Sequence, residues 1–280
     1  MGRWVNALNV RLPSATVEWW EAVLVALAGV GAGAINAAVG SGTLITFPTL
    51  VAIGFSPLVA NVSNNIGLVP GGVAGAWGYR RELGGLLPIL RRLIPCSALG
   101  GATGALLLLV LPAEAFKTIV PVLIAIALLM VIFQPRLAAA VTARQGTRAA
   151  SELSATWPKT RALGLGVVLG TFAAGVYGGY FGAAQGVLLI GLIGWLLTDS
   201  LQTANGLKNV LSAVVNAIAA VTFVIVSPDR VDWLIVLLIA VGSTVGGLLG
   251  ASLGRRLPAP VLRGVIVVVG LIAIVRLVLL

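Results

Sequence analysis

The sequence predicts an all-α polytopic membrane protein made of two homologous five-segment repeats, and three observations lead to this class. Hydrophobic residues make up 59% of the 280 residues and charged residues only 9%, whereas a soluble domain carries about a quarter. Long apolar runs recur from residue 22 to the end, and the charges lie in the gaps between them. The two halves of the chain also match each other. This composition excludes a soluble enzyme.

Charged residues and prolines divide the apolar sequence into ten predicted segments. They are residues 18–39, 43–54, 57–79, 93–111 and 116–134, followed by 162–183, 187–198, 201–226, 233–253 and 260–280. Residues 1–17 are predicted to form an N-terminal tail, and the repeats occupy residues 18–134 and 162–280. Residues 135–161 are the only long polar stretch, rich in Arg, and we expect them to be a cytoplasmic linker.

The second half repeats the first at an offset of 144 residues. The matched pairs include Gly31 with Gly175, Gly42 with Gly186, Asn61 with Asn205, and Asn65 with Asn209; further on the offset becomes 146 and pairs Ser97 with Ser243. Internal repeats are typical of secondary transporters. Shared small-residue composition is the alternative explanation, but chance seldom aligns two pairs of Asn.

The second segment of each repeat is too short to cross a membrane alone, because about 12 helical residues span about 18 Å of a core about 30 Å thick. If the first two segments form a hairpin or re-entrant pair, the repeats are inverted. If they form one broken crossing, the repeats are parallel. We prefer inversion, with broken or re-entrant helices at the midplane, because each break is short and rich in small residues.

Two such breaks are predicted to carry the chemistry: Gly40-Ser41-Gly42-Thr43 and Ala183-Ala184-Gln185-Gly186. Backbone that leaves a helix at membrane depth must be buried in protein or line a wet cavity. A helix that restarts there presents free N–H groups and a positive dipole end, which favour an anion. Ser41, Thr43 and Gln185 add side-chain donors. The alternative is a pair of tight turns at the membrane surface.

The third segment of each repeat carries polar residues on an otherwise apolar helix. In the second half Asn205, Lys208, Asn209, Ser212 and Asn216 share one helical face, and the first half has Asn61, Asn64 and Asn65. Lys208 is the only charge well inside an apolar segment, where a charge usually has a partner. A bound anion would be that partner; the alternatives are that Lys208 reaches the interface or pairs with Asp199. The alternative explanation for this row of polar residues is hydrogen bonding between helices.

The chain lacks the residues of most other membrane chemistries. It has no His, its single Cys96 lies in an apolar run, and all eight acids lie at or outside segment ends. We therefore expect no metal, no cofactor, no disulfide and no catalytic residues. A proton relay or sodium site is likewise not expected, so coupling would be absent or carried by a weakly acidic substrate. The basic residues flank apolar segments, which favours positive-inside topology over nucleic-acid binding.

The arrangement resembles the TauE/SafE family of sulfite and organosulfonate exporters. The resemblance rests on Gly29-Val30-Gly31, Gly40-Ser41-Gly42, Leu44-Ile45-Thr46-Phe47-Pro48, Ser56-Pro57 and Ala60-Asn61, echoed in the second half, and it covers the chain from about residue 24. It implies a multi-pass protein of the bacterial inner membrane that moves sulfite or organic sulfonates outward. Gln185 stands where the family commonly has Gly, which leaves the particular anion open.

We therefore predict a secondary transporter that exports sulfite or a small organosulfonate, with an anion site between the repeats. The predicted site residues are Ser41, Gly42, Thr43, Asn61, Asn65, Gln185, Gly186, Asn205, Lys208 and Asn209. Rival interpretations are a channel-like or uptake carrier for another small anion, and a non-transporting membrane subunit. Glycines spaced four apart, such as Gly100 and Gly104, predict close helix packing within the chain or in a homodimer.

Overall fold

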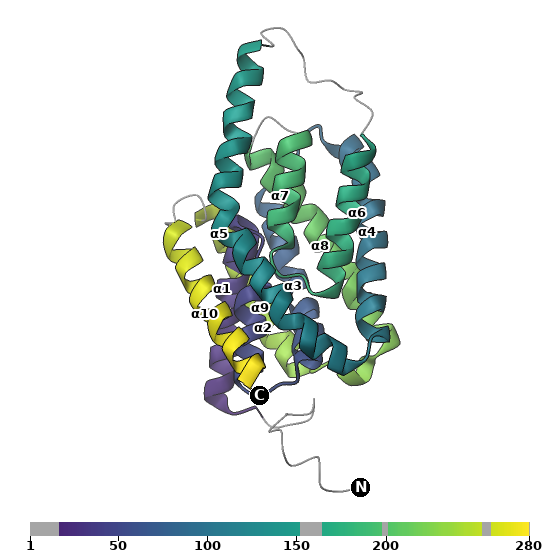
Figure 1. Cartoon of the computed structure of the whole chain (residues 1–280), viewed down its shortest axis with the longest axis vertical. Coiled ribbons are helices and arrows are strands. Elements are labelled where there is room, and N and C mark those ends of the chain that lie inside the picture. Colours follow the sequence, from purple (N-terminus) through teal and green to yellow (C-terminus); the bar gives the residue numbers. More distant parts are fainter. Residues whose placement is uncertain (1–16, 152–163, 198–200, 254–258, 280) are drawn as a thin grey trace, which may run out of the picture.

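The computed structural model describes residues 17–151, 164–197, 201–253 and 259–279, and within these ranges the protein is helical, without strands. Its helices are α1 (Trp19–Ala38), α2 (Thr43–Ala52), α3 (Pro57–Gly78), α4 (Leu87–Val110), α5 (Ala113–Ser151), α6 (Leu165–Tyr180), α7 (Gln185–Leu196), α8 (Leu201–Val226), α9 (Trp233–Leu253) and α10 (Ala259–Leu279). They form one bundle, from which the end of α5 projects (Figure 1). Most of the predicted tail, residues 152–161 of the predicted linker, and Asp199 lie outside the described residues.

Several helices are suited to a lipid environment. In the described residues five are long and apolar enough to cross a membrane: Trp19–Ala38, Leu87–Val110, Thr118–Arg136, Leu201–Val226 and Trp233–Ser252. The outside of the bundle is apolar, since Leu27 is 64% exposed, Val110 80% and Ile225 74%. A water-facing surface does not carry so many large apolar side chains. The prediction of an all-helical polytopic fold is therefore confirmed.

The helix bounds agree with the predicted segments at most ends and differ clearly at two. The segment predicted to begin at residue 93 begins as α4 at Leu87, because Arg91 and Arg92 interrupt the apolar run without ending a helix. The segment predicted to end at residue 134 continues as helix through Pro135 to Ser151. Residues 137–151 are rich in Ala and Arg, which are strong helix formers, so their polarity argues against lipid burial but not against a helix. The described part of the predicted linker is thus a helical extension of α5.

Polar side chains fix where two of the helices begin. The Ser56 hydroxyl accepts a hydrogen bond from the Val59 N–H (3.3 Å), and Pro57 occupies the first helical position of α3. Asp232 plays the same part for α9, because its carboxylate accepts from the Ile235 N–H (3.0 Å). The Asp232 N–H in turn donates to the Ser63 hydroxyl (2.9 Å), which ties the start of α9 to α3.

Glycines allow the closest helix contacts. The most extensive pairs are α1 with α9, α4 with α6, and α3 with α9. A Cβ on Gly33 would overlap with the Ser243 carbonyl oxygen of α9, and a Cβ on Gly104 would overlap with the Val176 carbonyl oxygen of α6. Backbones therefore touch directly at both crossings. The packing role predicted for the glycine rows is realised within one chain.

The last helices of the two halves, α5 and α10, run in opposite directions. Figure 1 shows α5 rising from the lower part of the molecule, whereas α10 beside it descends to the C-terminus. The two helices are in contact, as are α5 with α7 and α10 with α2. The helix contacts also match between the halves when each helix of α1–α5 is replaced by its counterpart in α6–α10. The contact of α5 with α7 then corresponds to that of α10 with α2, and the contact of α1 with α9 to that of α6 with α4.

Candidate functional site

The first break lies between α1 and α2 and turns on Gly40. The N–H groups of Val39 and Gly40 both donate to the Ile35 carbonyl, at 2.7 and 3.0 Å, which closes the C-terminus of α1. Gly40 has φ +88°, a left-handed conformation that L side chains rarely adopt. The chain then restarts as α2 at Thr43, with the Leu44 N–H donating to the Ser41 carbonyl at 3.1 Å.

The second break lies between α6 and α7 and has the same form. The N–H groups of Phe181 and Gly182 donate to the Tyr177 carbonyl at 3.0 and 3.2 Å, and Gly182 has φ +78°. Ala184, the residue before α7, is also left-handed, with φ +60°. The glycines that end α1 and α6 are therefore Gly40 and Gly182, which the 144-residue offset does not pair.

The two breaks meet in the interior of the bundle. The Gly186 N–H donates to the Gly40 carbonyl oxygen at 3.0 Å, and a Cβ on either glycine would overlap with the Cα of the other. Ser41 is wholly buried and Gln185 is 3% exposed. The breaks are therefore not turns on the protein surface. The Gly186 N–H, predicted to face an anion, is used here in the contact between the breaks.

The carboxyl end of α1 is held by two donors from α8. The Lys208 ammonium donates to the Asn36 and Ala37 carbonyl oxygens at 2.9 and 3.0 Å, and the Asn209 amide donates to the Ala37 carbonyl at 3.1 Å. The C-terminus of a helix carries partial negative charge, so a cation is favoured there. Lys208 is wholly buried and does not reach the interface.

The carboxyl end of α6 is held by a neutral donor from α3. The Asn61 amide donates to the Tyr180 carbonyl oxygen at 2.9 Å. One turn further along α3, the Asn64 amide donates to the Thr43 hydroxyl at 3.4 Å and accepts a hydrogen bond from the Thr46 hydroxyl. These contacts fix the start of α2 against α3.

Several buried polar atoms have no hydrogen-bond partner within the described structure, at the breaks and on α3 and α8, the helices that hold the ends of α6 and α1. Two of them are able to donate: the Ser41 hydroxyl and the Gln185 amide nitrogen. Three are amide oxygens, which accept: those of Asn61, Asn65 and Asn205. Each of the five residues is at most 8% exposed. Because a buried polar group without a partner costs about 1–3 kcal/mol, such a concentration indicates a site for a polar ligand.

Gln185 is positioned by its own hairpin. A Cβ on Gly178 of α6 would overlap with the Gln185 side-chain amide, so the absence of a side chain at residue 178 makes room for that amide. The sequence contained no signal for this role of Gly178.

The structure brings the predicted residues together in two groups. Ser41, Gly42, Thr43, Gln185 and Gly186 lie at the breaks, whereas Asn61, Asn65, Asn205, Lys208 and Asn209 lie on the buried faces of α3 and α8. The site residues that the prediction left out are Asn64 and Thr46. Asn64 was detectable, because it precedes Lys208 by the repeat offset of 144 residues.

A helical bundle with spans long and apolar enough to cross a membrane, two broken hairpins that meet in its interior and buried unpaired polar atoms is typical of a membrane transporter. Comparison with family models identifies which kind: the model of the sulfite exporter TauE/SafE family matches residues 25–277. The chain therefore belongs to the TauE/SafE family and is a multi-pass membrane transporter. Searches of curated proteins and of solved structures found no match.

Proposed function

We propose that this transporter exports a small sulfur oxyanion, sulfite in its hydrogensulfite form or a small organosulfonate, across the bacterial inner membrane. The observation that carries the proposal is the contact between Gly40 and Gly186, flanked by the unpaired donors of Ser41 and Gln185. The family assignment supports a sulfur anion as the substrate. The anion site lies between the two halves of the chain, where the breaks meet.

Lys208 supplies the positive charge of this site, and its side chain lies beside the second break. Its stem passes close to the break, because a Cβ on Gly186 would lie 2.8 Å from the Lys208 Cδ. Its protons are engaged by two α1 carbonyls, so it acts on the anion through the electrostatic field, which is strong in a low-dielectric interior. Lys208 thus both positions the end of α1 and favours an anion over a neutral solute.

Among the inorganic sulfur oxyanions, the amide oxygens at the site favour one that still carries a proton. Asn61, Asn65 and Asn205 each present a buried carbonyl oxygen that lacks a donor. A fully ionised oxyanion offers only acceptors to these oxygens, whereas hydrogensulfite offers one O–H donor as well as acceptors. The site therefore favours hydrogensulfite over sulfate, and the substrate's own proton accompanies each transport event.

The two halves act as inverted repeats. Three features support this: the antiparallel course of α5 and α10, the exchange symmetry of the helix contacts, and the shared left-handed glycines Gly40 and Gly182. In such transporters one repeat rocks against the other around a central site. Here that motion would break the hydrogen bond between Gly186 and Gly40 and free the Gly186 N–H for the substrate.

The test is flux by the purified chain alone in liposomes. We expect saturable movement of sulfite, little movement of sulfate, and a rate that falls as pH rises through the range where hydrogensulfite loses its proton. A channel-like conductance would instead give a non-saturable flux that follows the applied voltage. Absence of flux for every sulfur oxyanion would contradict the proposed substrate, and an unchanged sulfite rate at high pH would contradict selection of the protonated form.

A further inference from the structure

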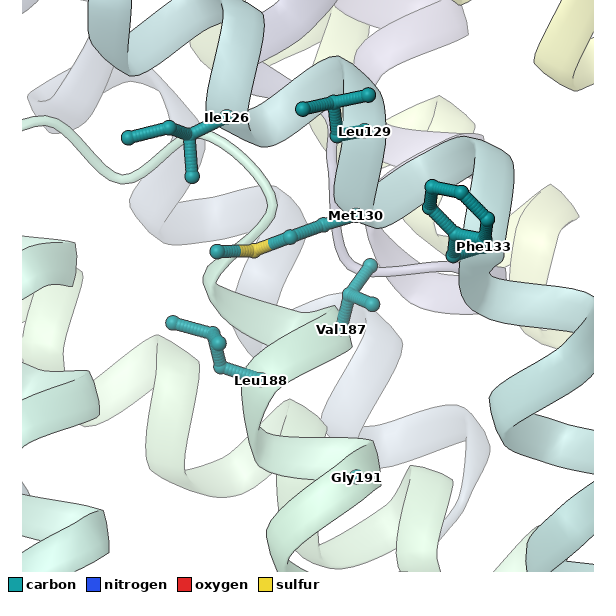
Figure 2. Close-up of a pocket in the computed structure, with 7 residues that line it drawn as sticks. All are labelled: Ile126, Leu129, Met130, Phe133, Val187, Leu188 and Gly191. Carbon is teal, nitrogen blue, oxygen red and sulfur yellow. The ribbon is translucent and has the colours of Figure 1, made fainter.

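A cavity of about 550 Å³ lies between α5 and α7, and none of the residues that line it belongs to the proposed anion site. Its lining is wholly apolar: Ile126, Leu129, Met130 and Phe133 from α5, and Val187, Leu188 and Gly191 from α7. Figure 2 shows the α5 side chains and those of α7 facing each other across the gap. The volume falls within the range of about 300–1,000 Å³ that small-ligand pockets occupy.

The cavity opens toward lipid rather than water. Leu129 is 53% exposed and Phe133 47%, and both lie in the candidate membrane span Thr118–Arg136. An apolar hollow in a lipid-facing surface loses dispersion contacts unless something apolar fills it. In a bilayer, the flexible acyl chain of a lipid is available to fill this cavity.

A cation is fixed at one end of the cavity. The Arg136 guanidinium lies 5.2 Å from the centre of the Phe133 ring, and Arg136 is exposed at the last position of the same span. Phe133 thus lines the cavity and carries the cation at once. Arginine binds phosphate with two parallel hydrogen bonds, and basic residues at the ends of membrane helices attract anionic lipid headgroups.

We propose that the groove between α5 and α7 binds an anionic phospholipid, with an acyl chain in the cavity and the phosphate on Arg136. The charge at the mouth selects an anionic headgroup, and the apolar lining selects the chain. The ligand is distinct from the transported anion, and its binding does not rest on the proposed function. It would hold α7, and therefore the second break that begins it, against α5.

The matched control is Arg80, which also stacks on an aromatic ring, 4.8 Å from the Trp77 ring centre, but lines no part of this cavity. The experiment measures binding of phosphatidylglycerol and phosphatidylcholine to the purified full chain by native mass spectrometry, with melting temperature as a second measurement. We expect the parent to prefer phosphatidylglycerol. Arg136→Gln lowers that preference about fivefold, the effect of one basic residue at an anionic membrane surface, whereas Arg80→Gln leaves it unchanged.

A second variant tests the cavity itself. Leu129→Trp fills the hollow from its exposed side, so the core packing is undisturbed, and we expect it to weaken binding of both lipids. Equal losses in Arg136→Gln and Arg80→Gln would overturn the proposal in favour of diffuse electrostatic attraction. Unchanged lipid binding in Leu129→Trp would also overturn it. Competition by a transported alkylsulfonate, abolished by Leu129→Trp, would assign the cavity to substrate instead.

Discussion

The carboxyl ends of α1 and α6 are built alike but capped differently. Each ends at a left-handed glycine in the interior, and each is held by a helix from the other half of the chain. The cap on α1 is the charged Lys208, assisted by Asn209, whereas the cap on α6 is the neutral amide of Asn61. The two helix ends therefore differ in charge, because only the end of α1 is held by a cationic side chain.

Asn64 occupies the position that matches Lys208 and has a different task. Its amide contacts Thr43 and Thr46 at the start of α2, instead of a carbonyl at the end of α6. The first half therefore fixes the restarting helix with a neutral side chain. The second half uses the same position to place a charge between the halves.

The largest effect is expected where the halves touch. Gly40→Ala requires a side chain at φ +88° and overlap with the Cα of Gly186. Overpacking of this kind costs about 1–3 kcal/mol, and it separates the breaks, so we expect sulfite flux in liposomes to be lost. Gly31→Ala is the control, because a Cβ there makes an ordinary 3.6 Å contact with Ile45. Equal flux in both variants would contradict the tight contact.

The next largest effect is expected on removal of the Lys208 charge. Lys208→Met keeps most of the side-chain volume but leaves the Asn36 and Ala37 carbonyls without their charged donor. Hydrogen bonds to a charged group contribute about 1.5–3 kcal/mol, so we expect the melting temperature to drop. We also expect sulfite flux to fall at least about tenfold, because two opposite unit charges within about 12 Å attract by about 1.4 kcal/mol or more at an effective dielectric constant of about 20.

Asn64→Leu, at the matching position, is the comparison for Lys208→Met. It removes no charge, so we expect a loss of flux at least several-fold smaller than that of Lys208→Met, measured in the same liposomes. If both variants lose flux equally, the difference between the two halves carries no electrostatic role.

A smaller effect is expected at the neutral cap. Asn61→Ala removes one hydrogen bond to the Tyr180 carbonyl, and a neutral hydrogen bond contributes about 0.5–1.5 kcal/mol. We expect a modest fall in melting temperature, with sulfite flux reduced less than tenfold. A loss as large as that of Lys208→Met would contradict the smaller contribution expected of this neutral side chain.

The sequence predicted the fold class and most of the elements because both depend on local composition. Apolar runs and their breaks placed the helices, and the extension of α5 to Ser151 was missed because polarity does not exclude a helix. The ungapped offset paired Gly31 with Gly175. In the structure it is Gly33 that contacts Ser243, as Gly175 contacts Ser97, so the equivalence in this helix is shifted by two residues.

The candidate site was predicted by residue type but not by partner. The rarity of a charge inside an apolar segment singled out Lys208, yet its acceptors are backbone carbonyls, which carry no sequence signal. The contact of Gly186 with Gly40 likewise depends on how distant hairpins pack, and the room that Gly178 leaves for Gln185 depends on tertiary structure.

Equilibrium binding of radiolabelled sulfite to the purified protein tests whether an anion binds where the breaks meet. The parent is compared with the double variant Ser41→Ala, Gln185→Leu. Each substitution removes a buried donor that has no partner within the described structure, the Ser41 hydroxyl and the Gln185 amide nitrogen, so we expect little change in melting temperature. We expect the double variant to bind sulfite at least tenfold more weakly, since each lost donor to a charged ligand contributes about 1.5–3 kcal/mol. Unchanged affinity in the double variant would contradict a site at the junction of Gly40 and Gly186.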